Sequence, residues 1–195
     1  MSNILYICRL FLLQNITNKQ KILLTFKKSY VKIKKKKKGT KKMEKIRGFE
    51  IAKGFEESNI QLPVRKTKYS AGYDIEAAED CIVPSFKKGM KPTLIKTGLK
   101  AYMQDDEVLI LANRSSNPGK KGLILANSIG VIDKDYYGNK DNDGHIMFAF
   151  FNIKDEDIEI KKGDCIGQGI FQKYLLVDND EAEGERLSGF GSTDK

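Results

Sequence analysis

The chain has 195 residues, of which 40% are apolar and 31% are charged. This length suffices for one or two domains with a hydrophobic core, and the composition excludes a disordered or collagen-like protein. The formal net charge of +9 favours a nucleic-acid binder only if it lies on the folded part. Residues 1–42 hold 13 Lys and Arg and no acid, which leaves 22 basic and 26 acidic residues, a charge of −4, for residues 43–195.

Cysteine usage argues against a disulfide framework and against a zinc site. Cys8, Cys81 and Cys165 are widely spaced and odd in number, and His145 is the one histidine. This pattern favours a reducing compartment, and we expect the cytoplasm.

Residues 1–42 form a basic extension. Their longest apolar stretch, residues 4–13, is interrupted by Arg9 and is about half the ~20 residues that a membrane span needs. We expect a solvated tail with weak affinity for polyanions, or a translated upstream segment with the true start at Met43. A transit peptide is the alternative, although such segments prefer Arg and Ser to Lys.

Residues 43–178 are predicted to form an all-β domain. Asn117-Pro118-Gly119, Asp143-Gly144 and similar turn sequences separate short apolar runs, a spacing typical of a β-sandwich or barrel. The predicted strands are residues 94–101, 108–111, 123–126, 129–132, 146–153, 158–160, 166–171 and 174–177. One short helix is expected near residues 50–57. Residues 179–195 are polar and then rich in small residues, which predicts a flexible C-terminal arm or simply a disordered terminus.

Three short segments carry groups suited to phosphate chemistry. Arg114-Ser115-Ser116 precedes a glycine-containing turn and offers a guanidinium, hydroxyls and amides for phosphate oxygens, unless it is an ordinary polar turn. Asp133 directly follows an apolar strand, at the rim of an expected pocket, where it could act as a general base or merely cap a turn. Asp74, after a small flexible pair, could face a hydrated Mg²⁺.

The order of these segments resembles a known family. The Asp74 turn, the Arg-Ser-Ser loop, the Gly-Val-Ile-Asp strand end, Gln168 between glycines and the Gly-Phe-Gly-Ser-Thr tail are similar, in order and spacing, to the trimeric dUTPases of bacterial or phage type. The resemblance runs from about Ile60 to Thr193. It implies a jelly-roll-like β subunit, a homotrimer with shared active sites, and Mg²⁺-dependent hydrolysis of dUTP to dUMP and pyrophosphate, which keeps uracil out of DNA and supplies dUMP for dTMP synthesis.

The resemblance also assigns residues to the phosphates. Asp74 would help to place the magnesium–triphosphate through water. Arg114, Ser115 and the amide of Ser116 would bind phosphate, and Gln168 would bond the α-phosphate region.

For the nucleoside, the resemblance assigns Asn127 to the uracil edge. Asp133 would orient and deprotonate the attacking water, and Tyr136 would pack under the deoxyribose so that a 2′-hydroxyl does not fit. The closing arm would supply five residues, with Phe190 stacked on uracil and the others near the γ-phosphate: Arg186, Phe190, Gly191, Ser192 and Thr193.

Three features depart from many relatives. Asn113 stands where many have Pro, and Cys165 stands where many have Arg. Residues 139–144 lengthen the turn after Tyr137, either as a neutral hairpin loop or as a surface for a regulatory protein.

Two alternatives remain open beside dUTP hydrolysis. A dCTP deaminase shares the subunit architecture but should have a general-base Glu beside the pyrimidine, and residues 127–138 contain none. A phage-type regulatory protein could use the arm as a nucleotide-dependent switch. No membrane and no specific nucleic acid are expected as partners.

Overall fold

The computed structural model describes residues 44–184 and Arg186. The predicted basic extension and the last nine residues, with Phe190, Gly191, Ser192 and Thr193, lie outside the described residues. No helix among residues 44–184 is long and apolar enough to span a membrane.

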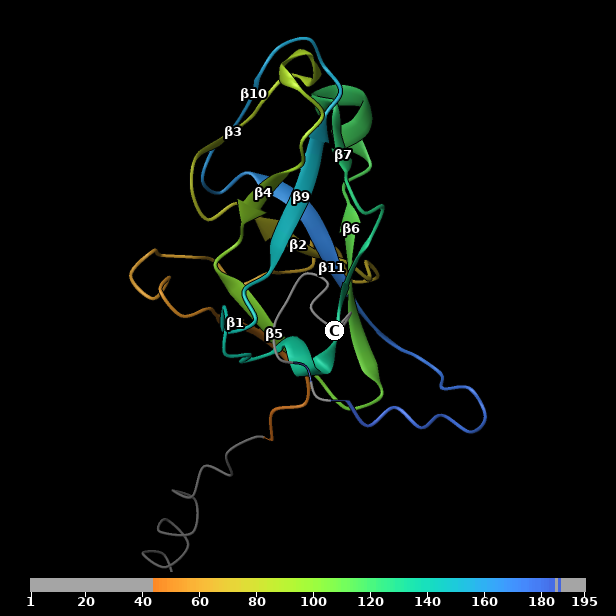
Figure 1. The fold of residues 1–195 in the computed structure, drawn as a ribbon. Helices are drawn as coiled ribbons and strands as arrows, with labels where there is room; N and C mark the ends of the chain where they lie inside the picture. The colour runs from red at the N-terminus through yellow and green to blue at the C-terminus, as the bar shows by residue number, and fades with distance from the viewer. Residues whose placement is uncertain (1–43, 185, 187–195) are drawn as a thin grey trace, which may run out of the picture. The chain divides into compact units, whose positions relative to one another are not determined.

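Short antiparallel strands are the main regular structure of the described chain (Figure 1). They are β1 (Gly48–Ile51), β2 (Tyr73–Glu76), β3 (Cys81–Val83), β4 (Thr93–Lys96), β5 (Leu99–Tyr102), β6 (Glu107–Asn113), β7 (Leu123–Leu125), β8 (Gly130–Ile132), β9 (Met147–Asn152), β10 (Ile158–Ile160) and β11 (Cys165–Lys173). Three single helical turns join them: η1 (Phe86–Lys88), η2 (Asn117–Lys121) and η3 (Lys134–Tyr136). The all-β prediction is confirmed.

The strands form four small sheets. The largest has the order β2-β11-β6-β8, a second has the order β4-β9-β7, and β1-β5 and β10-β3 are two-stranded. The long strand β11 therefore lies between β2 and β6, and it joins segments that are far apart in the sequence. Asp74 and Gln168 lie on strands of the largest sheet, and Arg114 and Asp133 directly follow two others.

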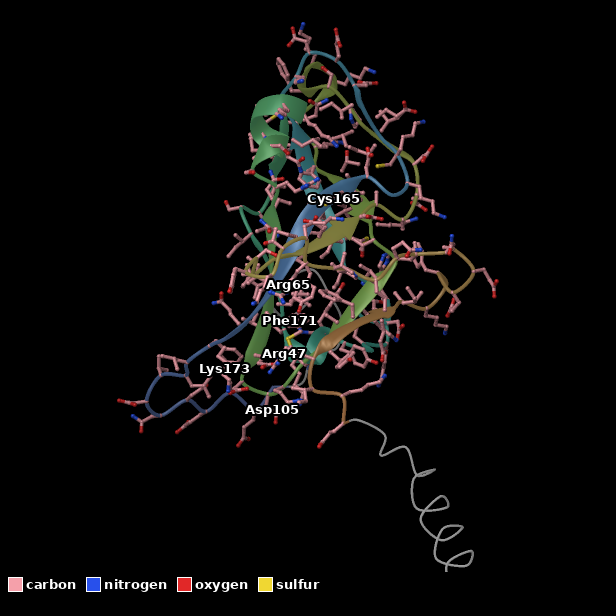
Figure 2. The ribbon with its side chains drawn as sticks, turned by 180° about the vertical axis from the view of Figure 1, so that it is seen from behind. Arg47, Arg65, Asp105, Cys165, Phe171 and Lys173 are labelled. Carbon is pink, nitrogen blue, oxygen red and sulfur yellow. The ribbon has the colours of Figure 1, made fainter. Side chains whose placement is uncertain are left out.

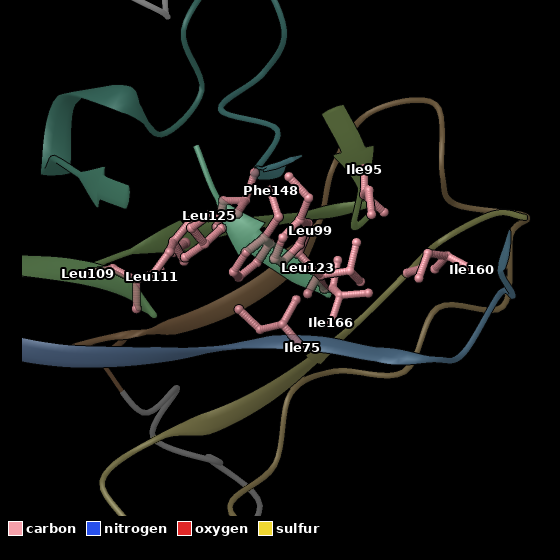
Figure 3. Close-up of a cluster of buried hydrophobic side chains, with 14 of the residues drawn as sticks. Ile75, Ile95, Leu99, Leu109, Leu111, Leu123, Leu125, Phe148, Ile160 and Ile166 are labelled. Carbon is pink, nitrogen blue, oxygen red and sulfur yellow. The ribbon is translucent and has the colours of Figure 1, made fainter. Parts of the chain in front are cut away.

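A single hydrophobic core lies between these sheets (Figure 3). Strand β9 alternates half-buried and buried side chains, so that Phe148 and Phe150 both point inward, with parallel rings 6.0 Å apart. Ile75, Leu109 and Ile166, from three strands of the largest sheet, face the same core. The burial of these side chains fixes which face of each strand is left for polar groups.

Two sequence predictions are wrong, and a third, one strand over residues 94–101, is divided at Gly98 into β4 and β5. Residues 50–57 form no helix, because residues 48–51 pair with β5 and place Phe49 and Ile51 against the core, and turns follow. Residues 174–177 form no strand, although they are apolar, and Leu175 is 96% exposed. In both segments tertiary pairing, not local pattern, decides the conformation.

Candidate active site

Strand β8 delivers Asp133 to the surface. The strand lies close against β6, because a Cβ on Gly130 would come within 3.0 Å of the Leu111 side chain. Asp133 follows Ile132 in extended conformation and begins the η3 turn. Its carboxylate therefore stands at a strand end, as the sequence predicted.

A cavity of about 190 Å³ opens beside this carboxylate. Four predicted site residues line it: Asn127, Asp133, Tyr136 and Arg186. The apolar walls come from both strands of the β6–β8 pair and from β9, and are formed by Leu111, Val131, Ile132 and Met147. Such a small, largely apolar hollow with a few converging polar groups suits a nucleoside-sized ligand.

Tyr136 is the buried member of this set. Its side chain is 7% exposed, and its hydroxyl donates to the carbonyl of His145 (2.9 Å) and accepts from Nδ2 of Asn142 (2.8 Å). Burial raises the pKa of this phenol, which therefore stays protonated at neutral pH. The ring is held as a fixed wall.

Arg186 contacts two carboxylates at the mouth of the cavity. Its guanidinium forms ion pairs with Asp133 and, at 2.8 Å, with Asp135. A phosphate contact by Arg186, as the resemblance implies, would require the guanidinium to exchange a carboxylate for a phosphate oxygen.

A second group of predicted residues gathers on β2 and β11. Asp74 lies directly opposite Gln168, so both half-buried side chains share one face of the sheet. Gly72 permits this arrangement, because a Cβ there would lie 2.1 Å from Oε1 of Gln168. Lys66 Nζ is 4.0 Å from Asp74 and adds positive charge.

Cys165 lies at the start of β11, near both Asp74 and Arg114. Burial raises the pKa of its thiol, the Arg114 guanidinium acts against this, and Asp74 adds to it. The thiol is therefore neutral at physiological pH. Cys81 and Cys165 are both free thiols, as the sequence predicted for these two; Cys8 lies outside the described residues.

The Arg114-Ser115-Ser116 loop follows β6 and rests on two asparagine side chains. Asn113 donates to the carbonyl of Leu123 (2.9 Å) and accepts from buried Asn117 (2.8 Å). Asn117 also donates to the carbonyl of Ile166 on β11 (2.8 Å). Sequence reasoning noted Asn117 only as part of a turn, and no local pattern reveals this buried support.

The two groups lie at opposite ends of β6. Leu109 pairs with Ile132, so the same register places Asp133 beside Val108, while Arg114 follows the far end of the strand. Six residues of extended chain span roughly 20 Å. One chain therefore brings Asp74, Gln168 and Arg114 together, and separately Asn127, Asp133 and Tyr136, but it does not join the two groups.

A larger hollow of about 430 Å³ contains none of the predicted site residues. Arg47, Arg65, Phe171 and Lys173 line it, on the side shown in Figure 2. Arg47 is paired with the nearly buried Glu107, and Lys173 with Asp106, so much of its positive charge is already neutralised.

The sequence model of the dUTPase family matches residues 58–193. This chain belongs to the dUTPase family. It is 54% identical over 151 residues to the deoxyuridine 5′-triphosphate nucleotidohydrolase of Lactococcus lactis, an alignment that covers 76% of this chain and 98% of the relative. A Debaryomyces hansenii protein of the same name is 33% identical, with 70% of this chain and 82% of the relative covered.

Solved structures of the family agree. The crystal structure of dUTPase from Streptococcus mutans is 45% identical and matches with a TM-score of 0.63, over 67% of this chain and 98% of that chain. The dUTPase of phage phi11 of Staphylococcus aureus is 19% identical, with a TM-score of 0.55 over 71% and 97% of the two chains, which shows the shared fold alone. The jelly-roll-like fold expected from the sequence is thus confirmed.

Proposed function

We propose that this protein hydrolyses dUTP to dUMP and pyrophosphate. The observation that carries the proposal is the cavity in which Asp133, at a strand end, stands beside the fixed ring of Tyr136 and the polar edge of Asn127. The match to the dUTPase family, which extends over most of the described chain, also supports dUTP as the substrate. Removal of dUTP keeps uracil out of DNA, and the product dUMP is available for dTMP synthesis.

Asp133 acts as the general base. Its carboxylate accepts a proton from water while the water oxygen bonds to the α-phosphorus, and the bond from that phosphorus to the oxygen bridging to the β-phosphate breaks. Pyrophosphate leaves with the bridging oxygen. Tyr136 packs against the deoxyribose, and Asn127 with its neighbouring backbone reads uracil.

The second group of residues binds the triphosphate. Arg114, Ser115 and the amide of Ser116 neutralise and orient phosphate oxygens, and Gln168 bonds near the α-phosphate. Positioned cations and amides are the main catalytic need of phosphoryl transfer, and removing one donor typically costs ~10²–10³ in rate.

Asp74 suits Mg²⁺ that is bound mainly by the substrate. Residues 44–184 contain no cluster of three His, Cys, Asp or Glu side chains that could hold a metal alone, and Asp74 is a half-buried carboxylate beside the phosphate-binding loop. Mg²⁺ keeps several waters and commonly uses one or two carboxylates together with substrate phosphates. Bound there, the ion would neutralise phosphate charge.

A homotrimer with shared sites, which the family resemblance implies, is supported by the roughly 20 Å between the two groups. In such a trimer Asp133 of one subunit would meet Arg114 of another, since one chain does not join them. The exposed apolar residues 174–177, directly after β11, offer a surface that association would cover. Residues 43–178 thus form the catalytic body, and residues 179–195 the arm that closes the site, with Phe190 on uracil.

The test is pyrophosphate release by the protein with Mg²⁺, offered dUTP, dCTP, dTTP and UTP in parallel. We expect release from dUTP alone. Release from several nucleotides would contradict the assigned roles of Asn127 and Tyr136. Binding of dUTP without release would favour a regulatory protein, and ammonia from dCTP would favour a deaminase.

A further inference from the structure

The lengthened turn at residues 139–144 is directed at Tyr136. Nδ2 of Asn142 donates to the Tyr136 hydroxyl (2.8 Å), and Nδ2 of Asn139 donates to the Tyr136 carbonyl (2.9 Å). The turn therefore holds the residue at both ends, at the tip of its ring and at its backbone.

The two asparagines also hold one another. Asn139 donates to Oδ1 of Asn142 (2.8 Å), and its own Oδ1 accepts from the amides of Asp141 (3.0 Å) and Asn142 (3.1 Å). Oδ1 of Asn142 accepts from the amide of Gly144 (3.0 Å). With both polar atoms of its amide engaged, Asn142 has little freedom to release the phenol.

Glycine is required where the turn closes on Tyr136. Gly144 has a φ of +80°, and a Cβ there would come within 2.6 Å of the Tyr136 carbonyl oxygen. The backbone of the turn thus packs directly against the backbone of the residue that it holds.

Neighbouring segments fix the turn in place. The carboxylate of Asp143 accepts from Nζ of Lys100 on β5 (2.6 Å) and from the amide of Lys53 (2.9 Å). The side chains of Lys100 and Asp143 are partly shielded from water. Salt therefore screens this ion pair less than it would a pair on the open surface. The turn is a support anchored to the body, not a free hairpin.

We propose that Asn142 is a positioning residue that fixes the Tyr136 ring and thereby sets the discrimination between deoxyribose and ribose. The inference rests on the proposed function, in which this ring is the wall under the sugar. A wall that excludes one hydroxyl must be rigid, because a small displacement of the ring would admit the 2′-oxygen. Asn142 supplies that rigidity without touching the nucleotide.

The test compares kcat/KM for dUTP and UTP in the wild type, Asn142→Ala and Asn142→Asp. The carboxylate of the second variant keeps the size of the side chain but does not donate to the phenol. We expect both variants to lower the ratio of dUTP to UTP by about tenfold, the effect of one lost hydrogen bond to a buried group. Asp141→Ala, an exposed substitution in the same turn, is the matched control and should leave the ratio unchanged.

The variant Tyr136→Phe tests whether Asn142 acts on the ratio through its hydrogen bond to the Tyr136 hydroxyl or through the general stability of the turn. This variant keeps the ring but removes the acceptor of Asn142, so adding Asn142→Ala should then change the ratio no further. A loss of activity toward both nucleotides in proportion, with an unchanged ratio, would overturn the proposal.

Measuring the binding of dUMP and UMP to the same variants tests the role of Asn142 separately from the proposed dUTP hydrolysis. If the wild type releases no pyrophosphate from dUTP, the proposed function fails, and the ratio of the two dissociation constants still decides the role of Asn142. A ratio lowered in Asn142→Ala supports positioning, whereas an equal ratio in the wild type and Asn142→Ala excludes it.

Discussion

Asp133 is the residue on which the proposed chemistry depends most directly. Asp133→Asn keeps the shape of the side chain but removes its basicity, so we expect kcat to fall by about 10²–10⁴ with little change in KM for dUTP. Steady-state kinetics of pyrophosphate release measure both constants. Asp135→Asn is the matched control, since Asp135 also pairs with Arg186 but does not line the cavity, and its kcat should fall far less. A kcat near that of the wild type in Asp133→Asn would exclude the base.

Two glycines, Gly72 directly before β2 and Gly167 in β11, allow effects on activity to be distinguished from effects on stability. In Gly72→Ala the new methyl would meet the flexible end of Gln168, at 2.1 Å from Oε1, so we expect that side chain to turn away and kcat/KM to fall by at least ~10-fold, with a nearly unchanged melting temperature. In Gly167→Ala the methyl would lie 2.2 Å from the buried Phe148 ring, and overpacking should destabilise the fold by ~1–3 kcal/mol. Thermal melts and kinetics on both variants check this contrast, which equal losses of stability would contradict.

At the scale of elements, His145 connects the supporting turn to the β4–β5 corner. Its Nε2 accepts from the amide of Gly98 (3.0 Å), and its ring lies 4.7 Å from that of Phe55. Burial lowers the pKa of this imidazole, Lys96 adds to the effect, and Glu79 opposes it. The fold therefore requires the neutral imidazole of His145, whose Nε2 is free to accept the hydrogen bond from Gly98.

A pH dependence of stability follows. As the pH is lowered, the unfolded chain takes up a proton on His145 at about pH 6.5, whereas the folded chain does so only at a lower pH. The contribution of neutral His145 to the free energy of unfolding is therefore complete above about pH 6.5. It falls by up to ~1.4 kcal/mol per pH unit as the pH drops toward the lowered pKa of the folded state. Urea unfolding between about pH 7.5 and pH 5 measures the slope. His145→Gln has an acceptor that does not titrate, and its slope should be shallower. Identical slopes would show that His145 does not contribute.

The sequence predicts elements unevenly. Strands such as β6, β9 and β11 are long or bounded by turns, and their apolar runs locate them. Strand β2 escapes prediction because two of its four residues are acidic, and its place is decided by pairing with β11. The helix predicted near residues 50–57 fails for the same reason, since pairing of residues 48–51 with β5 outweighs local pattern.

The candidate site shows the same division. Motif order locates Asp74, Arg114, Asp133 and Gln168, because each stands in a recognisable local context. The support that Asn117 and Asn142 give to neighbouring residues is hidden in the sequence, since a side-chain amide in a turn most often serves its own backbone. The separation of Arg114 from Asp133 is also hidden, because the register of β8 on β6 fixes it.

At the scale of the whole molecule, the register between β6 and β8 leads to a prediction about assembly. If Arg114 of one subunit serves Asp133 of another, neither residue needs its partner on the same chain. Arg114→Ala and Asp133→Asn should each be nearly inactive alone. Coexpressed in equal amounts, they should assemble at random, so that about three quarters of the trimers are mixed and about a quarter of all sites draw both intact residues from different chains. Pyrophosphate release by the purified mixture should then approach that share of wild-type activity. A mixture no more active than its two components would mean that one chain supplies the complete site, and the roughly 20 Å between the two groups would have to close by a movement within the subunit.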